Sequence, residues 1–328
     1  MNILTMGWYD HNNLGDESYK DTFCSLFPQH NFIFSDNPKK ELIDKCDVVL
    51  LGGGNVIKQA YLDELQKIKN KPIYGFSIGM EDENLNIPPK LFKHIYARDE
   101  NTLNILKKKK IPCSYFPDSA FILQGNAEEG RHWLKAKYKQ ENLDLYENVI
   151  AIVVNSYILH NNLSSLARDS VAFLKFSYDL ARIADETNAS FVFIPFGTGM
   201  PIDDRVANGW VASKCKYWKK NLVIFDRINY KTALNIISSA NLTISSRLHS
   251  SIFSYVAGTP FIDITHHSKN EFFLKSIGKQ HLSVPFWNFD IDKVRILIDD
   301  MMSQPKHKEA TPLTQKVWND VSTIHFTK

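Results

Sequence analysis

Arginine, histidine and several hydroxyl side chains are concentrated in one short segment, residues 245–251 (SSRLHSS). The segment follows an apolar stretch, Leu242–Ile244, that is typical of a buried strand, and helical spacing continues to about Ala257. Arg247 carries a rigid guanidinium that can hold a carboxylate or phosphate, and His249 can exchange a proton near neutral pH. The pattern predicts an anion clamp and a general acid at a helix N-terminus. The competing interpretation is a buried histidine held by its neighbours, with a serine capping the helix.

More basic residues follow the next expected strand, Pro260–Ile264. His266 and His267 are adjacent, so on a strand their side chains would point to opposite faces, which does not suit one metal ion. Lys269 is either an anion contact or a solvated loop lysine. No two pairs of cysteine or histidine have zinc-ligand spacing, and we expect no metal site.

Two glycine-containing loops in the first third of the sequence have the composition of ligand-binding turns. Residues 7–17 (GWYDHNNLGDE) lie between a short apolar stretch and a helical pattern. Within them, Asp16 either caps the helix or accepts hydrogen bonds from sugar hydroxyls. The loop Gly52–Asn55 ends the apolar run Val48–Leu51, and three consecutive glycines favour a ligand-lining loop over a plain turn. Neither loop has G-x-G-x-x-G spacing or a P-loop lysine.

Two further basic features have two interpretations each. Arg98 follows the candidate strand Ile95–Ala97, so it either faces a ligand at the carboxyl end of the sheet or forms a structural ion pair. The candidate partners are Asp99, Glu100 and Asp118. The run Lys107–Lys110 is interpreted as a solvated helix end, with contact to anionic lipid headgroups as the second interpretation.

Short apolar runs and helical patterns alternate along the whole chain, which favours βαβ units and parallel sheets. A second round of alternation opens at Ile150–Val154. We therefore predict two doubly wound α/β domains with a binding crevice between them. The predicted divisions are a domain over 1–147, a domain over 148–290 and a helical tail over 291–328 that returns to the first domain.

Composition excludes several classes of protein. Hydrophobic residues make up 44% of the 328 residues and charged residues 23%, values that exclude a disordered chain. No apolar run approaches the roughly 18 residues of a membrane helix. A net charge of +3, from 39 basic and 36 acidic residues, does not favour nucleic acid as a partner. Four scattered cysteines and the absence of a signal-peptide pattern predict a cytoplasmic protein with reduced thiols.

Taken together, these motifs resemble the polysaccharide pyruvyl transferase family. The resembling segments occur in the expected order over roughly residues 3–277. They are Gly7–Glu17 with its NLGDE core, Leu51–Asn55, Ala97–Glu100, Pro117–Ala120, Ser246–Ser250, Gly258–Pro260 and Lys269. Residues 194–205 are also similar, but carry Phe196–Thr198 where a more polar segment is expected.

The resemblance implies a GT-B-like fold of two Rossmann-type domains and the transfer of pyruvate from phosphoenolpyruvate to a sugar, which forms a pyruvate ketal. The domain over 1–147 would then hold the acceptor, and the domain over 148–290 the phosphoenolpyruvate. His249 becomes the acid and Arg247 the clamp. The other residues assigned to phosphoenolpyruvate are Leu248, Ser250, Lys269, Arg98 and Arg205. Those assigned to the acceptor sugar are Asn13, Asp16, Gly53, Gly54 and Asn55.

This chemistry requires no organic cofactor and no metal, because phosphoenolpyruvate is the donor substrate. The expected partners are phosphoenolpyruvate and a glycan acceptor of exopolysaccharide synthesis, whether free, nucleotide-bound or lipid-linked. A transient membrane-surface contact is compatible with this interpretation. The alternatives are a GT-B glycosyltransferase or sugar epimerase that uses a nucleotide-sugar, and a non-catalytic sugar-binding protein. The acceptor sugar, the hydroxyls bridged, the ketal stereochemistry and the oligomeric state stay open.

Overall fold

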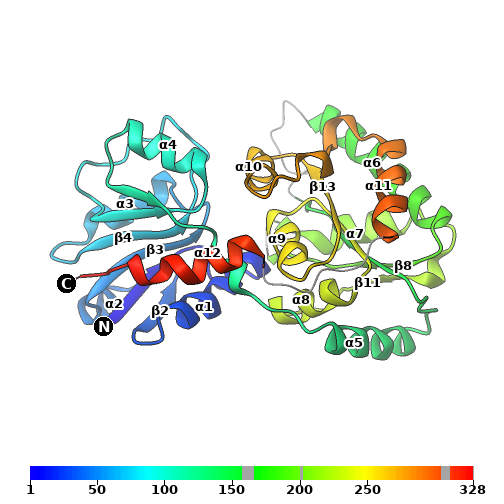
Figure 1. Cartoon of the computed structure of the whole chain (residues 1–328), viewed down its shortest axis with the longest axis horizontal. Coiled ribbons are helices and arrows are strands. Elements are labelled where there is room, and N and C mark those ends of the chain that lie inside the picture. Colours follow the sequence, from blue (N-terminus) through cyan, green and yellow to red (C-terminus); the bar gives the residue numbers. More distant parts are fainter. Residues whose placement is uncertain (157–165, 200–201, 304–310, 328) are drawn as a thin grey trace. The chain divides into compact units, whose positions relative to one another are not determined.

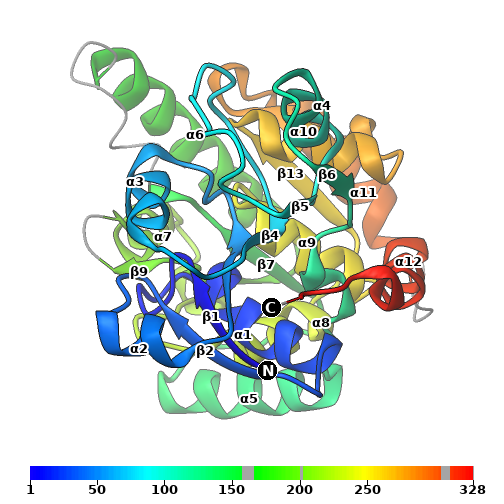
Figure 2. The ribbon, with the colours of Figure 1, turned by 90° about the vertical axis from the view of Figure 1, so that its left-hand side faces the viewer.

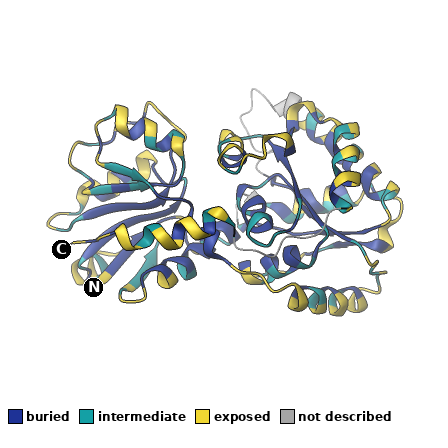
Figure 3. Cartoon of the chain, in the orientation of Figure 1, coloured by how far each residue is buried: buried dark blue, intermediate teal, exposed yellow. Residues whose placement is uncertain are grey.

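The computed structural model describes residues 1–156, 166–199, 202–303 and 311–327. The chain divides into two compact units: unit 1 is Met1–Leu123 with Ala310–Lys328, and unit 2 is Gln124–Glu309. Within the described residues, each unit contains a six-stranded sheet whose neighbouring strands are all parallel. The predicted class, two doubly wound α/β domains, is confirmed. Figure 3 shows that the strands of both sheets are largely buried and that the exposed residues lie mainly on helices and loops.

The sheet of unit 1 has the order β2-β1-β3-β4-β5-β6. Its strands are β1 (Asn2–Met6), β2 (Asn31–Ser35), β3 (Val48–Gly54), β4 (Ile73–Ile78), β5 (His94–Ala97) and β6 (Cys113–Tyr115). Because β1 lies between β2 and β3, the order reverses direction at the β1–β3 pair (Figures 1 and 2). Ligands of open parallel sheets bind outside the carboxyl ends of the strands at such a reversal.

Both faces of this sheet are covered. The helices of unit 1 are α1 (Leu14–Leu26), α2 (Lys40–Lys45), α3 (Gln59–Lys67), α4 (Glu100–Lys108) and α12 (Pro312–Asp320), with the short turns η1 (Ser119–Ile122) and η6 (Val321–Thr323). One face packs Leu4 and Met6 against apolar residues of α2, α3 and α4. On the other face, aromatic rings of α1 contact Phe76 of β4, and Phe326 joins them, 5.3 Å from Phe27.

The sheet of unit 2 has the order β11-β8-β7-β12-β13-β14. Its strands are β7 (Val149–Val153), β8 (Ser190–Phe193), β11 (Asn221–Val223), β12 (Leu242–Ser245), β13 (Phe261–Thr265) and β14 (Ser283–Pro285). A small antiparallel ladder joins β9 (Thr198–Gly199) to β10 (Ile202–Asp203). The strand order reverses between β7 and β12, where Val153 pairs with Ser245. This is the strand order of a Rossmann sheet.

The helices of unit 2 connect and cover these strands (Figure 1). They are α5 (Ala127–Gln140), α6 (Leu166–Glu186), α7 (Asp204–Ala212), α8 (Tyr230–Ser239), α9 (Leu248–Val256), α10 (Ser268–Ser276) and α11 (Ile291–Met302). Three short turns complete the described elements of the unit: η3 (Trp218–Lys220), η4 (Gln280–Leu282) and η5 (Phe286–Asn288). No helix that the structure describes has both the length and the apolar composition needed to span a bilayer.

The division into units differs from the sequence-based boundaries at both ends. The sequence pattern places the first boundary at residue 147, whereas the structure places it after Leu123. The reason is α5, which packs so closely on α8 that a Cβ at Gly130 would overlap the carbonyl of Asn235. The side chain of Asn235 also accepts from Asn126 N at 2.8 Å.

The predicted tail over 291–328 is divided between the two units. Its first helix, α11, belongs to unit 2, and Ala310–Lys328 belongs to unit 1. There α12 packs on η1, and Thr314 donates its hydroxyl to the Phe121 carbonyl at 2.6 Å. Near the C-terminus, Thr327 N donates to the hydroxyl of Tyr74 at 3.2 Å.

Candidate functional site

The predicted clamp lies where the strand order of unit 2 reverses. The segments that leave β7 and β12 are tied together there, because Ser246 N donates to the Val153 carbonyl at 2.9 Å and Asn155 N donates to Ser246 Oγ at 2.7 Å. Arg247 comes next in the chain and is the N-cap residue of α9. The sequence segment therefore has the strand-to-helix position that its pattern predicted.

A carboxylate that the sequence did not assign holds the guanidinium of Arg247. Arg247 Nη2 donates to Asp204 Oδ1 at 2.6 Å, and the Asp204 side chain is completely buried. The same carboxylate accepts four more hydrogen bonds, from Ser156 N and Oγ and from the backbone N–H groups of Phe196 and Gly197. Since the carboxylate has so many donors, it is a rigid anchor for the arginine. Two consecutive aspartates at 203–204 were the only sequence signal for it.

One edge of this guanidinium has unused hydrogen-bonding capacity. Arg247 Nε is buried and has no hydrogen-bond partner among the described residues. A buried donor left without an acceptor costs about 1–3 kcal/mol, so an oxyanion gains this amount once a shift of the side chain opens Nε to it. The arrangement suits a carboxylate or a phosphate.

The first turn of α9 contains the remaining residues of the predicted motif. His249 is half-buried in that turn, and no side chain caps the helix. The part of the competing interpretation in which a serine caps α9 is therefore wrong. Ser250, predicted to bind phosphoenolpyruvate, donates its buried hydroxyl to the Arg247 carbonyl at 2.8 Å and also contacts Ser245 Oγ. The side chain of Ser250 is therefore used within the turn. Leu248 and Ser250 can contribute to anion binding only through their backbone N–H groups.

Basic side chains from the end of β13 complete a positive environment. Burial is the main reason that the pKa of His266 falls to about 3, and the charges of His267, Lys269 and Arg247 lower it further. His266 is therefore a neutral imidazole at pH 7, with Nε2 3.1 Å from Asn155 Nδ2. Lys269 is half-buried in the first turn of α10. Arg247 and Lys269, two of the residues predicted to contact the anion, are thus both near enough to His266 for their charges to act on it.

Asp263 connects the two helices that border this site. Its buried carboxylate accepts from Ser251 of α9 at 2.6 Å and from Asn270 of α10 at 2.9 and 3.0 Å. Thr265 donates to it at 3.0 Å. Burial raises the pKa of Asp263 to about 6, although these hydrogen bonds oppose the rise. The sequence pattern placed Asp263 in a strand and indicated no further role for it.

In unit 1, the residues predicted to bind the acceptor lie at the β1–β3 reversal. Asn13 is the N-cap of α1, and its side chain accepts from Gly15 N at 3.2 Å. Asp16 is therefore not the cap, and its carboxylate lies against Gly54, where a Cβ would come within 2.8 Å. Gly53 and Gly54 have φ values of +73° and +82°, which side-chain-bearing residues rarely adopt. This explains the glycines of the loop and places Asp16 beside them.

Arg98 is already engaged in a buried network. Its Nη1 donates to Asp118 at 3.0 Å and to the hydroxyl of Tyr19 at 2.9 Å, and its Nη2 donates to Asn55 Oδ1 at 2.6 Å. The side chain is 5% exposed. The structure therefore supports the ion-pair interpretation of Arg98, and it makes this arginine the residue that orients Asn55.

Arg205 also has a local carboxylate partner. Its Nη2 lies 2.5 Å from Asp203 Oδ2 and its Nε 2.8 Å from Oδ1. Its Nη1 donates to the Phe225 carbonyl at 3.1 Å. This fork compensates the charge of Arg205, so its predicted contact with phosphoenolpyruvate has less support than that of Arg247.

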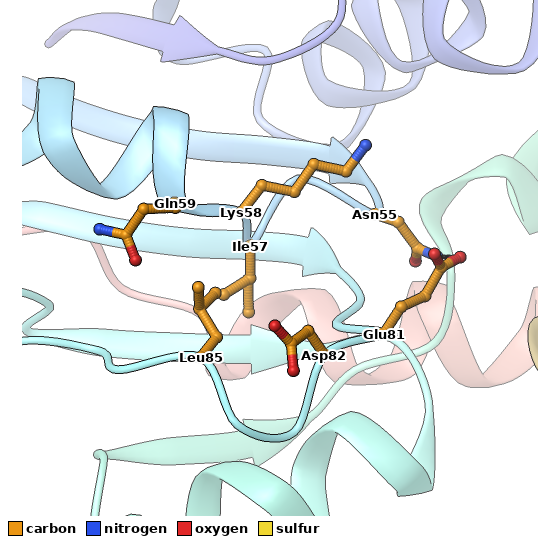
Figure 4. Close-up of a pocket in the computed structure, with 7 residues that line it drawn as sticks. All are labelled: Asn55, Ile57, Lys58, Gln59, Glu81, Asp82 and Leu85. Carbon is orange, nitrogen blue, oxygen red and sulfur yellow. Dashed lines mark hydrogen bonds between the residues drawn. The ribbon is translucent and has the colours of Figure 1, made fainter. Parts of the chain in front are cut away.

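A pocket of ≈ 230 Å³ lies beside Asn55 in unit 1 (Figure 4). Its lining residues are Asn55, Ile57, Lys58, Gln59, Glu81, Asp82 and Leu85. Asn55 and Glu81 point toward each other and form a hydrogen bond of 2.5 Å, while Ile57, Leu85 and Asp82 converge at another side. Amides, carboxylates and an amine around a small apolar patch suit a polyhydroxylated ligand.

The loop after β1 presents an aromatic surface that sequence analysis did not assign. Trp8 is 42% exposed, and its ring stacks on His11 with centroids 3.6 Å apart. Asp36 fixes this stack, because it lies 2.8 Å from His11 Nε2 and accepts from the hydroxyl of Tyr61 at 2.7 Å. The indole ring of Trp8 is therefore held in place by His11 and remains partly exposed. Asp10 and Asn12, in the same loop, adopt positive φ values of 64° and 54°.

No group of three or more His, Cys, Asp or Glu side chains that could hold a metal ion occurs in the part of the chain that the structure describes.

Comparisons with known proteins agree with the motif-based interpretation. The model of the family described as polysaccharide pyruvyl transferase matches residues 8–268. No curated protein matches the chain.

Solved structures show the fold. UDP-GlcNAc 2-epimerase from Methanocaldococcus jannaschii is similar, with a TM-score of 0.61, 12% identity and 98% coverage of both chains. A putative UDP-N-acetylglucosamine 2-epimerase from Listeria monocytogenes gives a TM-score of 0.55 and 10% identity, with 98% of this chain and 96% of that one covered. An E. coli structure described as trehalose-6-phosphate bound with UDP-2-fluoro glucose gives a TM-score of 0.52 and 11% identity, with 98% and 96% covered. The fold is of the GT-B type, as expected.

Proposed function

The chain belongs to the polysaccharide pyruvyl transferase family, and from this premise we propose that it transfers pyruvate from phosphoenolpyruvate to a sugar of a polysaccharide or its precursor. The product is a pyruvate ketal and the by-product is inorganic phosphate. The observation that carries this proposal is the guanidinium of Arg247, which has one nitrogen anchored on Asp204 and a buried Nε with no described partner, two residues before His249.

Donor binding and the first proton transfer have candidate groups in unit 2. Arg247, Lys269 and the first N–H groups of α9 bind the carboxylate or phosphate of the donor. His249, as an imidazolium, protonates the methylene carbon of the enol phosphate, and the adjacent carbon becomes electrophilic. A sugar hydroxyl adds there and loses its proton, the C–O bond to phosphate breaks, and a second hydroxyl closes the ketal. Two new C–O bonds form, and the hydroxyl protons balance the one that His249 supplied and the one that leaves with phosphate.

The acceptor is assigned to unit 1. Asp16 and Asn55 supply acceptors and donors for hydroxyl groups, and the pocket beside Asn55 offers polar side chains around an apolar patch. The exposed ring of Trp8 suits the C–H edge of a pyranose, because the negative face of the indole attracts the positively polarised hydrogens. These features favour a glycan as the second substrate.

The test is phosphate release from phosphoenolpyruvate in the presence of a series of acceptor glycosides, followed by NMR of the product to locate the ketal. Arg247→Lys and His249→Gln are the informative variants. We expect the wild type to release phosphate only when an acceptor is present. A protein that binds glycans without releasing phosphate would contradict the proposal.

A thermal-shift comparison separates this function from that of the enzymes with similar folds. We expect phosphoenolpyruvate to raise the melting temperature and UDP-GlcNAc to leave it unchanged. The opposite result would favour a nucleotide-sugar enzyme, the class to which the similar UDP-GlcNAc 2-epimerases belong.

A further inference from the structure

Large apolar side chains gather on the solvent side of α6, α7 and the segments that flank β11. Eight of them are between 42% and 68% exposed. They are Val171, Leu174, Tyr178, Val206, Trp210, Tyr217, Trp218 and Phe225. We call these residues, with Lys214, Lys216 and Lys219, the aromatic–lysine surface. Patches of exposed apolar groups on this scale mark binding surfaces.

The members of this surface on α6 and α7 lie side by side. On α6, Val171, Leu174 and Tyr178 follow helical spacing along one face. On α7, which packs against α6 (Figure 1), Val206 and Trp210 are four residues apart on the exposed side.

Lys214 joins the two helices. Its ammonium lies 4.2 Å from the ring centroid of Trp210 and 5.5 Å from that of Tyr178. Phe225 extends the surface beside α7, since its ring would lie 3.6 Å from a Cβ at Gly209.

The charge of this surface is positive. Lys216 and Lys219 are exposed beside the aromatic residues. The neighbouring carboxylates have described partners: Asp185 accepts the backbone N–H groups of Lys216 and Tyr217, Asp203 pairs with Arg205, Asp226 pairs with Lys137, and Asp179 pairs with Lys175. Lysines therefore outnumber unpaired carboxylates on this surface, and an anionic partner would encounter a net positive charge.

We propose that the aromatic–lysine surface binds anionic phospholipid membranes peripherally. Tryptophan and tyrosine prefer the headgroup region, where an apolar ring and a polar edge are both accommodated. Lysine stems lie along apolar surface while the ammonium reaches the phosphates. Lysine is depleted at protein–protein interfaces, so a second copy of this chain fits the composition less well. The proposal stands independently of the transferred group, because its readout is membrane binding.

The experiment is flotation of the full-length protein with phosphatidylcholine vesicles, with and without phosphatidylglycerol. We expect binding to the vesicles that contain phosphatidylglycerol, and weaker binding in high salt, where the Debye length falls to about 3 Å at 1 M. Trp210→Ser should weaken partitioning about tenfold through lost apolar contact. Lys214→Gln should weaken it about fivefold, the effect of one lysine at an anionic surface.

Matched controls come from unit 1. Trp318 on α12 is 47% exposed, as is Trp210, so Trp318→Ser removes an equally exposed indole. Lys108→Gln removes an exposed charge within the lysine run at 107–110, which also tests the lipid contact considered for that run. Both controls should bind within about twofold of the wild type, since neither lies on the proposed surface. Circular dichroism melting of all four variants checks that they fold.

Three outcomes would overturn the proposal. The first is no binding to anionic vesicles. The second is an equal loss in the Trp210 and Trp318 variants, or in the Lys214 and Lys108 variants. The third is a dimer in light scattering that Trp210→Ser dissociates, which would make this surface a subunit interface.

Discussion

Replacing Gly197 by alanine places one methyl group against the guanidinium of Arg247, and this change separates positioning from stability. A Cβ at Gly197 lies 2.8 Å from Arg247 Nη2, whereas ordinary contact begins at 3.4 Å. The nitrogen must therefore retreat by about 0.6 Å, the difference between these distances. Since Nη2 is also held 2.6 Å from Asp204 Oδ1, the retreat disturbs the ion pair that aims the guanidinium.

The expected effects on rate and stability differ in size. A misplacement of about 1 Å costs up to ~10²-fold in rate, so a shift of about 0.6 Å predicts a loss of roughly tenfold to thirtyfold in kcat/KM for phosphoenolpyruvate. The guanidinium is the end of a flexible side chain and can move, and alanine lowers the entropy of the unfolded chain. We therefore expect the free energy of unfolding to change by less than about 1 kcal/mol.

The assay is phosphate release under limiting phosphoenolpyruvate, with calorimetric titration of the donor and urea unfolding of the same samples. Gly209→Ala is the matched control. It lies within α7, and its Cβ would meet Phe225 at 3.6 Å, an ordinary contact. We expect it to keep wild-type kcat/KM and to gain roughly 0.5–1 kcal/mol of stability from helix propensity.

Wild-type kcat/KM and an unchanged dissociation constant in Gly197→Ala would refute the reasoning that the position of Arg247 controls donor binding. A loss of more than about 3 kcal/mol in unfolding free energy would show that the guanidinium cannot move away from the added methyl group. It would refute the expectation that the substitution alters the position of Arg247 with little effect on stability.

The remaining predictions concern protons and the buried carboxylates. His249→Gln should lower turnover by ~10²–10⁴-fold while phosphoenolpyruvate still binds, as the loss of a general acid requires; equal turnover would exclude that role. Asp204→Ala should cost about 3–5 kcal/mol in urea unfolding, because Arg247 and several backbone N–H groups lose their acceptor; a change below about 1 kcal/mol would contradict the buried ion pair. The pKa of Asp263 is raised to about 6 in the folded state, above its usual value of 3.8, so its stabilising contribution is complete at low pH and is lost as pH rises through 6. Relative to the wild type, Asp263→Asn should therefore gain about 3 kcal/mol between roughly pH 4 and pH 7, and a flat difference would contradict the burial. Phosphoenolpyruvate should raise the pKa of His266 from about 3, because a nearby anion favours the imidazolium; NMR titration of the imidazole would show no change if the anion binds elsewhere.

Much of the fold could be predicted from the sequence, because buried parallel strands have a characteristic local pattern of residues. β7 and the first four residues of β3 are uninterrupted apolar runs, as expected for strands covered on both faces. The boundary between the two units could not be predicted in this way. The charged segment around α5 has a helical pattern that does not show which domain it joins, and its contact with α8 depends on Gly130 and Asn235, which are more than 100 residues apart in the chain.

Some features of the candidate site could also be predicted from the sequence, and others could not. The position of Arg247 and His249, at a helix start directly after a strand, was predictable, because the strand, the arginine and the helix start are contiguous in the sequence. Trp8 and His11 were not recognised as a stacked pair, since the positive φ values of Asp10 and Asn12 bend the loop in a way that spacing does not reveal.

The sequence by itself determined the alternation of strands and helices, the glycine loop at 52–54 and the basic helix start at Arg247, since each depends on neighbouring residues. The tertiary structure decided the partners. Asp204 reaches Arg247 across 43 positions of the chain, and Tyr19, Asn55 and Asp118 converge on Arg98 from three separate segments. Strand order brings such residues together, and that order arises from packing the whole sheet between its helices. A buried charge needs a partner wherever the fold supplies one, and a linear pattern of residue types does not specify which carboxylate that will be.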